Sequence, residues 1–307
     1  MPIESVDTIW MDGDLVPWDE ARVHVLTHAF QYGTGVFEGI RCYPTERGPA
    51  VFRLEDHVRR LYRSAAIYRL TIPFDPETIA EGIRQTIRAN GLSACYIRPV
   101  AYRGYGEMGV NLGPEPARVT IVAWPWGTYL GEDSIEAGVR VLVSSWRRND
   151  ANAVPPAAKA TGQYLNSALA KAEALEAGFD EALLLNPQGF VADGSGQNVF
   201  VVRDGTVITP PESAGILLGI TRESVMQLAR DLGHEVRERN LVRTDLYTAD
   251  EVFLTGTAAE VVPVRDIDGR TIGDGQRGPV TKALQAEFFA AARGELDRYT
   301  AWNDPVT

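Results

Sequence analysis

The chain has 307 residues, 45% of them hydrophobic, and a formal net charge of −11 at pH 7. This length favours two packed lobes over one core, and without a basic stripe a nucleic-acid partner is not expected. No apolar run approaches the ~20 residues of a membrane span, and MPIESVDTIW at the start does not resemble a signal peptide. We therefore expect a soluble, cytoplasmic protein with no membrane partner.

The first half of the chain predicts alternating strands and helices. A strand pair surrounds the Asp12-Gly13 turn in IWMDGDLVPW. The apolar spacing of Val58, Leu61, Ala65 and Tyr68 predicts one face of an amphipathic helix. In order, the further elements expected here are a strand over 35–43, helices over 57–70 and 76–91, and strands over 95–103 and 118–126.

The Gly-rich, acidic stretch 127-GTYLGEDSIEAG-138 is predicted to be a linker between a small domain, 1–126, and a large domain, 139–307. In the second half, Thr221 is expected to be the N-cap of a helix that runs to Leu232. The other predicted elements are a strand over 139–146, a helix over 163–177, strands over 181–185 and 190–194, a hairpin over 198–210, a strand region over 251–264 and a helix over 281–293. The pattern indicates a two-domain α+β or α/β fold.

Several common site motifs are absent or out of context. The segment 104-GYGEMG-109 matches G-x-G-x-x-G, but VNLGPEP follows it where a dinucleotide site needs a helix. The four histidines lack H-E-x-x-H spacing, and Cys42 and Cys95 form no C-x-x-C pair. We expect neither a metal site nor a disulfide framework.

Lys159 is the first candidate for chemistry. It lies among alanines in AVPPAAKATGQYLNS and is one of only three lysines among 30 basic residues. Burial lowers the pKa of a lysine, and the neutral amine can form a Schiff base with a carbonyl group, which arginine cannot. If the carbonyl belongs to pyridoxal phosphate, the protein must also supply a phosphate site, a carboxylate for the pyridine nitrogen and a donor for the phenolic oxygen.

Each of these parts has a candidate. The helix start 219-GITRES-224 and the hydroxyl of Thr257 suit a phosphate, because a helix N-terminus favours anions. Tyr164 is the candidate donor, and Asp193 in ADGSGQN is the candidate carboxylate. Taken singly they could be an ordinary capped helix, a core aromatic and a turn aspartate. Their joint presence favours the cofactor.

With these residues in place, the chain resembles the branched-chain amino-acid aminotransferases, which are fold-type-IV, D-amino-acid-aminotransferase-like enzymes. The resemblance runs from about Trp10 to Trp302 and rests on the blocks 35-GVFEGIRCY-43, 57-HVRRL-61, 96-YIRP-99, 108-MGVN-111, 158-AKATGQYLNS-167, 193-DGSGQN-198, 217-LLGITR-222 and 255-TGTAAE-260. It implies pyridoxal 5′-phosphate as cofactor, ping-pong transamination of Leu, Ile and Val with 2-oxoglutarate, and at least a homodimer.

The resemblance also implies a role for each matching residue. Lys159 would form the Schiff base and then move the proton between substrate Cα and cofactor C4′. The implied cofactor contacts are Arg60, Tyr164, Asp193, Leu217, Gly219, Ile220, Thr221 and Thr257. The implied substrate contacts, some of them from a partner subunit, are Tyr32, Phe37, Tyr96, Arg98, Met108, Val110, Trp126, Tyr129 and Ala258. Arg98 is the expected partner of the distal carboxylate of glutamate, because arginine pairs with carboxylates in good geometry.

The chain departs from the family pattern at four positions. Asp193 and Gln197 stand where the family carries glutamates, and Thr161 and Gln163 stand where glycine and asparagine are expected. D-amino-acid aminotransferase, (R)-amine transaminase and aminodeoxychorismate lyase share the fold and remain alternatives. A catalytically inactive protein of the same fold is the alternative of another class.

Overall fold

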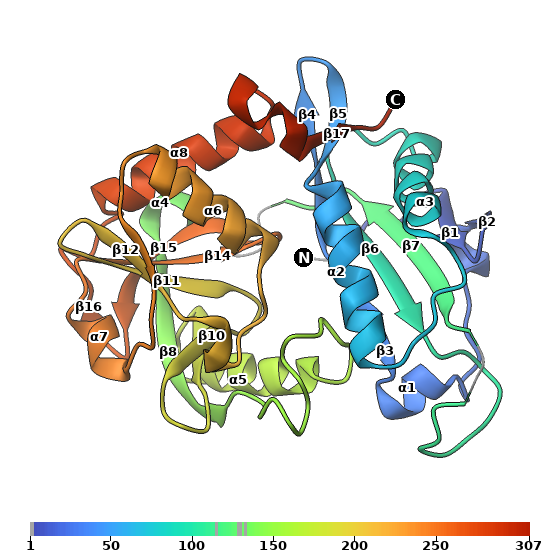
Figure 1. The fold of residues 1–307 in the computed structure, drawn as a ribbon, viewed down its shortest axis with the longest axis horizontal. Coiled ribbons are helices and arrows are strands. Elements are labelled where there is room, and N and C mark those ends of the chain that lie inside the picture. The colour runs from blue at the N-terminus through green and yellow to red at the C-terminus, as the bar shows by residue number, and fades with distance from the viewer. Residues whose placement is uncertain (1–2, 114–115, 128–130, 132–133) are drawn as a thin grey trace. The chain divides into compact units, whose positions relative to one another are not determined.

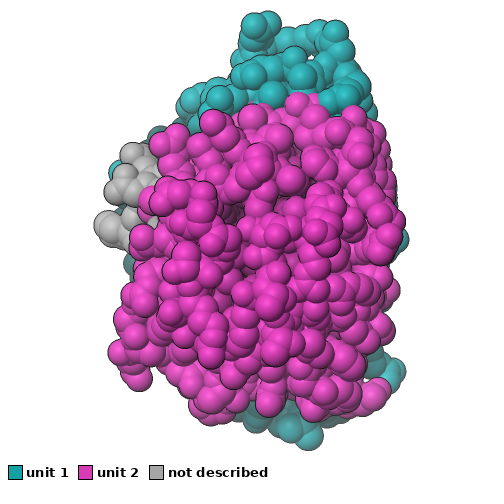
Figure 2. Space-filling view, turned by 90° about the vertical axis from the view of Figure 1, so that its left-hand side faces the viewer, with its two compact units in different colours: residues 1–126, 158–162, 290–307 teal, residues 127–157, 163–289 magenta. Residues whose placement is uncertain are grey.

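The computed structural model describes residues 3–113, 116–127, 131 and 134–307. The chain forms two compact units: unit 1 contains Met1–Trp126, Ala158–Gly162 and Ala290–Thr307, and unit 2 contains Gly127–Ala157 and Gln163–Phe289 (Figures 1 and 2). The sequence placed everything after the 127–138 linker in one domain. The structure instead groups the Lys159 segment with unit 1, because the Lys159 carbonyl accepts a hydrogen bond from Phe37 N at 2.9 Å.

Unit 1 is built on a sheet that has eight strands among the described residues, each strand pairing antiparallel. The strand order is β17-β5-β4-β6-β7-β1-β2, and β3 also pairs with β6. The strands are β1 (Thr8–Met11), β2 (Asp14–Pro17), β3 (Gly35–Phe37), β4 (Ile40–Thr45), β5 (Gly48–Phe52), β6 (Cys95–Tyr102), β7 (Arg118–Trp124) and β17 (Asn303–Pro305).

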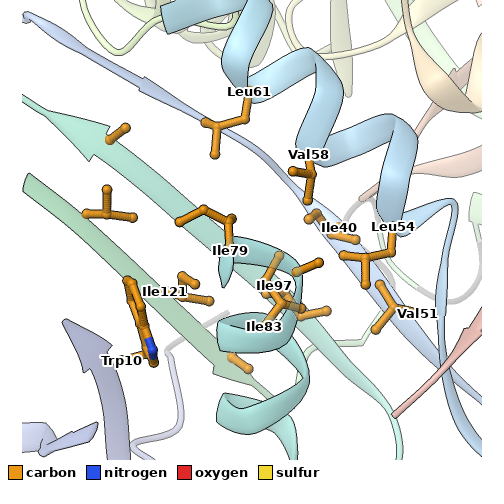
Figure 3. Close-up of a cluster of buried hydrophobic side chains, with 14 of the residues drawn as sticks. Trp10, Ile40, Val51, Leu54, Val58, Leu61, Ile79, Ile83, Ile97 and Ile121 are labelled. Atoms are coloured by element: carbon orange, nitrogen blue, oxygen red, sulfur yellow. The ribbon is translucent and has the colours of Figure 1, made fainter. Parts of the chain in front are cut away.

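Two helices cover this sheet, α2 (Leu54–Ile67) and α3 (Pro76–Ala89). Helix α3 begins at a proline, and the Asp75 carboxylate accepts a hydrogen bond from Thr78 N at 2.7 Å, a favourable N-terminus. Apolar side chains of both helices meet those of β4, β6 and β7 in one buried cluster (Figure 3). The shorter helices of unit 1 are η1 (Trp18–Glu20), α1 (His28–Tyr32) and η3 (Asp297–Trp302).

Unit 2 contains a mixed sheet, with nine strands among the described residues. The order is β10-β9-β8-β15-β14-β11-β12-β13, with β16 on β15, and β8 pairs parallel with both β9 and β15. The strands are β8 (Val139–Arg147), β9 (Glu181–Leu185), β10 (Val191–Gly194), β11 (Asn198–Arg203), β12 (Thr206–Thr209), β13 (Val236–Glu238), β14 (Glu251–Gly256), β15 (Glu260–Ile267) and β16 (Arg270–Thr271).

The helices of unit 2 pack around this sheet. Helix α5 (Tyr164–Glu176) contacts β8 and β9, and α6 (Ile220–Asp231) contacts β14. The others are α4 (Ser134–Ala137), η2 (Glu212–Ala214), α7 (Arg243–Tyr247) and α8 (Pro279–Ala292), whose last turn belongs to unit 1. In the described part of the chain, no helix combines the length and apolarity that crossing a membrane requires.

The predicted mixture of helices and sheets is confirmed, but some element boundaries differ. The strand predicted over 35–43 is interrupted at Glu38 and Gly39, which separate β3 from β4. Thr221 is not an N-cap: Gly219, in an extended conformation, precedes the helix, and Thr221 lies buried within its first turn. Both differences occur at residues near the candidate site.

Candidate active site

Lys159 lies beside β3, between Ala158 and Ala160, which are completely buried. Its backbone N–H donates to Ser64 Oγ at 3.0 Å, and its Nζ lies 5.1 Å from the centroid of the Phe37 ring. The lysine is only partly buried, so the apolar sequence context described its neighbours rather than a fully desolvated amine. The amine is thus placed against an aromatic face by a backbone that the sheet holds.

Thr161 explains one of the four departures from the family pattern. Its hydroxyl lies 2.9 Å from Gly33 O and 3.1 Å from Gly35 O, and its N–H donates to Gly35 O at 2.8 Å. A glycine at this position could make only the backbone bond. The threonine therefore adds a side-chain tether between the lysine segment and the chain just before β3.

Arg60, on α2, is held by a carboxylate that the sequence reasoning missed. Its Nε and Nη2 donate to Glu38 Oε1 and Oε2 at 2.7 and 2.8 Å, and His57 Nδ1 lies 2.7 Å from Glu38 Oε2. Glu38 and His57 lie within the blocks 35-GVFEGIRCY-43 and 57-HVRRL-61, which was the available signal. The arginine is therefore held in a fixed orientation.

Burial and charge set the protonation of this network. Burial alone would raise the pKa of Glu38, but Arg60 and His57 outweigh it and hold that pKa well below its ordinary value. Burial lowers the pKa of His57 despite the adjacent carboxylate. A neutral His57 that faces an ionised carboxylate must carry its proton on Nδ1 and donate it.

Arg98 lies in an aromatic cluster. Its Cζ is 4.5 Å from the Phe37 ring centroid and 5.3 Å from that of Tyr96, and its Nη2 donates to Tyr96 Oη at 3.1 Å. The Tyr96 ring in turn packs edge-on against Trp124 and Trp126. The structure thus brings together four of the predicted substrate residues and adds Trp124.

Gly39 makes room for this cluster. A Cβ at Gly39 would lie 2.0 Å from Tyr96 Oη, far inside van der Waals contact. Any larger residue would displace the tyrosine hydroxyl that supports Arg98. The sequence reasoning did not select Gly39, although it follows Glu38 in the same block.

Three further predicted substrate residues are exposed in the single chain. Tyr32, Met108 and Val110 have exposed fractions of 43, 51 and 87%. The Tyr32 ring lies 4.7 Å from that of His28, whose Nε2 lies 2.7 Å from Gly109 O. These three residues therefore belong to one surface region, while Tyr129 lies outside the described residues.

In unit 2, Asp193 lies buried in the edge strand β10. Asn198 Nδ2 donates to its Oδ1 at 2.8 Å, Leu217 N donates to its Oδ2 at 2.9 Å, and Arg148 Nη2 lies 3.6 Å from Oδ2. Burial raises the pKa of Asp193, and Arg148 opposes that shift. A carboxylate has about four acceptor positions, so these bonds leave capacity for a further N–H donor.

The predicted phosphate-binding segment begins α6. No side chain caps its first amides, so the helix start offers N–H donors and a favourable field for an anion. A Cβ at Gly219 would lie 2.0 Å from Asn198 Oδ1, so only glycine fits beside that asparagine. Thr257 and Ala258 lie in the partly exposed turn after β14, and Tyr164 is the first residue of α5.

Gln197 has a structural partner that explains its departure from the family pattern. Its Nε2 donates to Glu181 Oε2 at 2.9 Å, and Lys171 Nζ lies 3.0 Å from the same oxygen. Glu181 is completely buried, and an ionised carboxylate can only accept hydrogen bonds. The amide supplies a donor where a glutamate would place a second carboxylate against the first.

The residues fit a phosphorylated pyridine aldehyde. Lysine supplies an amine, Arg60 and the start of α6 suit a phosphate, and Asp193 suits a protonated ring nitrogen. Among the residues that the structure describes, no cluster of three or more His, Cys, Asp or Glu side chains could hold a metal ion.

Comparison with known proteins gives concordant matches. The model of the amino-transferase class IV family matches residues 35–267. A branched-chain-amino-acid aminotransferase of Salmonella typhimurium is 47% identical over 309 residues, covering 100% of this chain and 99% of the relative. The crystal structure of the Escherichia coli branched-chain amino acid aminotransferase superposes with a TM-score of 0.97 at 46% identity, covering 99% of this chain and 100% of the other.

A second solved structure carries a ligand. It is a branched-chain amino acid aminotransferase of the source abbreviated T.th., complexed with N-(5′-phosphopyridoxyl)-L-glutamate. It has a TM-score of 0.95 and 49% identity, and the match covers 99% of each chain.

Proposed function

Because this chain belongs to the class IV aminotransferases, we propose that it transfers the amino group of branched-chain L-amino acids to 2-oxoglutarate with pyridoxal 5′-phosphate. The products would be branched 2-oxo acids and L-glutamate. The observation that carries this proposal is Arg98, a cation held among the rings of Phe37 and Tyr96. Such a wall offers apolar contact to an aliphatic side chain and a charged donor to a second carboxylate.

The bound cofactor supplies a carbonyl group for the amino substrate and a ring that withdraws electrons. The amine of Lys159 holds the cofactor and, once displaced, moves the proton at substrate Cα. Asp193 keeps the ring nitrogen protonated, and Tyr164 donates to the phenolic oxygen. The phosphate is assigned to Arg60, Gly219, Ile220, Thr221 and Thr257, and the ring packs against Leu217.

The two substrates place opposite demands on one site. Burying a branched aliphatic side chain contributes roughly 1.5–3 kcal/mol, which favours the apolar walls Phe37, Tyr96 and Trp126. The distal carboxylate of glutamate needs a charged partner, which we assign to Arg98. The glutamate adduct in the T.th. structure supports this second substrate for the family. The substrate α-carboxylate is assigned to the turn at Thr257 and Ala258.

We also propose that the protein works as a homodimer. Segment 23–32 and loop 104–110 contact each other through the His24 and Tyr105 rings, 4.6 Å apart. Together they expose large apolar side chains, namely Val23, Val25, Leu26, Phe30, Tyr32, Tyr105, Met108 and Val110, which we call the unit 1 apolar surface. An exposed apolar surface of this kind favours association, and a second copy would cover it.

Half-reaction spectra test the proposed activity. The purified holoprotein is mixed separately with L-Leu, L-Glu, D-Ala and (R)-1-phenylethylamine, and the loss of visible absorbance is followed. We expect fast bleaching by L-Leu and L-Glu, and none in Lys159→Ala. Bleaching by D-Ala or the amine alone would assign the chain to another activity on this fold, and a protein that ignores added pyridoxal phosphate would refute the enzyme.

A further inference from the structure

Asn198 connects residues assigned to opposite ends of the cofactor. It is buried at the first position of β11 and pairs in register with Thr255, near the end of β14. Its Nδ2 donates to Asp193 Oδ1 and to Leu217 O, both at 2.8 Å. Both amide protons are therefore used, one on each partner.

Leu217 closes this arrangement. Its N–H donates to Asp193 Oδ2 at 2.9 Å, while its carbonyl accepts from Asn198, so the backbone is held on both sides. We call Asp193, Asn198 and Leu217 the Asn198 triangle. All three are linked by hydrogen bonds, and every bond of the triangle ends on Asp193 or on the Leu217 backbone.

The triangle also reaches the start of α6. The carboxamide oxygen of Asn198 occupies the space that a Cβ of Gly219 would take, at 2.0 Å. Gly219 follows Leu217 by two residues and immediately precedes the first amides of α6. A shift of the Asn198 side chain would therefore move the carboxylate and the helix start together.

We propose that Asn198 is a positioning residue that fixes the distance between the ring-nitrogen carboxylate and the phosphate-binding helix start. The proposal rests on the cofactor roles given above for Asp193 and for α6. Asp193 is one methylene shorter than the glutamate of the family, so its carboxylate has less reach and depends more on where the backbone holds it. Asn198 and Leu217 define that place, and through Gly219 they tie it to the phosphate end.

The test compares two ends of the cofactor in the apoprotein. We would measure the dissociation constant of pyridoxal 5′-phosphate by absorbance, and that of inorganic phosphate by competition. Asn198→Ala is expected to weaken both by about tenfold or more, since each lost hydrogen bond leaves a buried acceptor unsatisfied. Asp193→Asn is expected to weaken pyridoxal phosphate but to leave inorganic phosphate unchanged.

Asn186→Ala is the matched control. Asn186 is also buried in unit 2 and also makes two hydrogen bonds, to Ala214 O at 3.1 Å and from Phe190 N at 2.9 Å. The substitution should lower the melting temperature of the apoprotein without changing either dissociation constant. If Asn198→Ala lowers only the melting temperature, or leaves phosphate binding unchanged, Asn198 is structural and the proposal fails.

Gly219→Ala gives a second test that does not depend on Asn198→Ala folding well. Its new Cβ would push Asn198 away, so both dissociation constants should rise as in Asn198→Ala. In the double variant the clash is absent, and Gly219→Ala should add no further loss. Additive losses would contradict the link. If the wild-type protein binds no pyridoxal phosphate at all, the proposed function fails instead, so the two failures are distinguishable.

Discussion

The Glu38 carboxylate and the Arg60 guanidinium form a two-pronged ion pair, with contacts of 2.7 and 2.8 Å. Glu38 is completely buried and Arg60 is 8% exposed. A guanidinium in this position is an expected anion partner, yet two of its five N–H donors already hold a carboxylate. The pair fixes the plane of Arg60 and leaves its remaining donors in a defined orientation.

Removing only one charge from this pair should strongly destabilise the apoprotein. We expect Glu38→Gln to lower the free energy of unfolding by about 3–5 kcal/mol, because a buried guanidinium would lose its counter-charge. Urea denaturation measures the loss. The double variant Glu38→Gln/Arg60→Met should lose much less than the sum of the single variants, and strict additivity would contradict a coupled pair.

An exposed pair provides the control. Arg237 and Glu235 are in contact at 2.7 Å, with exposed side-chain fractions of 60 and 55%. Water screens such a pair, so Glu235→Gln should change the free energy of unfolding by less than about 1 kcal/mol. A comparable loss at both sites would mean that burial is not the cause.

His57 should make the apoprotein less stable in mild acid. Burial lowers the pKa of His57 below the ordinary 6.5, so below pH 6.5 the unfolded chain takes up a proton that the folded chain resists. The free energy of unfolding therefore falls as pH falls, by at most about 1.4 kcal/mol per pH unit for one proton. His57→Gln keeps a donor for Glu38 but does not titrate.

Urea denaturation of wild type and His57→Gln between pH 8 and 5 isolates this contribution. The variant should lose the part of the pH slope that begins near 6.5, and parallel curves would rule His57 out. Below pH 4.5 the lowered pKa of Glu38 adds a loss of the same sign, because the unfolded carboxylate protonates first.

Arg98→Ala should separate the two substrates. The guanidinium is assigned to the distal carboxylate of glutamate, so single-turnover rates with L-Glu should fall by about tenfold or more beyond the fall with L-Leu. Some loss with L-Leu is expected, since Arg98 also packs on the Phe37 ring. Equal losses with both substrates would remove Arg98 from that role.

Gly39→Ala should disturb the same cluster from the backbone side. Its Cβ would meet Tyr96 Oη at 2.0 Å, so we expect a higher KM for both amino acids. Tyr96→Phe in that background should restore part of the loss by removing the hydroxyl. Gly106→Ala is the control because a Cβ there would meet nothing within 4 Å, and an equal effect of both alanines would exclude the clash.

A charge on the unit 1 apolar surface should disrupt self-association. Phe30 is 71% exposed, and Phe30→Asp should shift the sedimentation coefficient from dimer to monomer. Val242→Asp, at a 41% exposed apolar residue of unit 2, should leave the dimer intact. A wild-type monomer, or dissociation only in the second variant, would place the interface elsewhere.

The sequence by itself determined the elements and most of the residues of the site. Apolar periodicity predicted α2 and α3, the Asp12-Gly13 turn predicted the first hairpin, and motif blocks identified Lys159, Arg60 and Arg98. These signals are local, because periodicity, turn residues and motifs act within a few positions of each other. They could not reveal that the Lys159 segment joins unit 1.

Only the tertiary structure decided which distant side chains share charges and protons. Glu38 meets Arg60 across 22 positions, Asp193 meets Leu217 across 24, and Gln197 meets Glu181 across 16. Each pairing involves a buried carboxylate whose partner depends on how strands and helices stack, not on its neighbours in the chain. Burial makes these pairings costly to leave unsatisfied, so packing rather than local pattern selects the residues that orient the site.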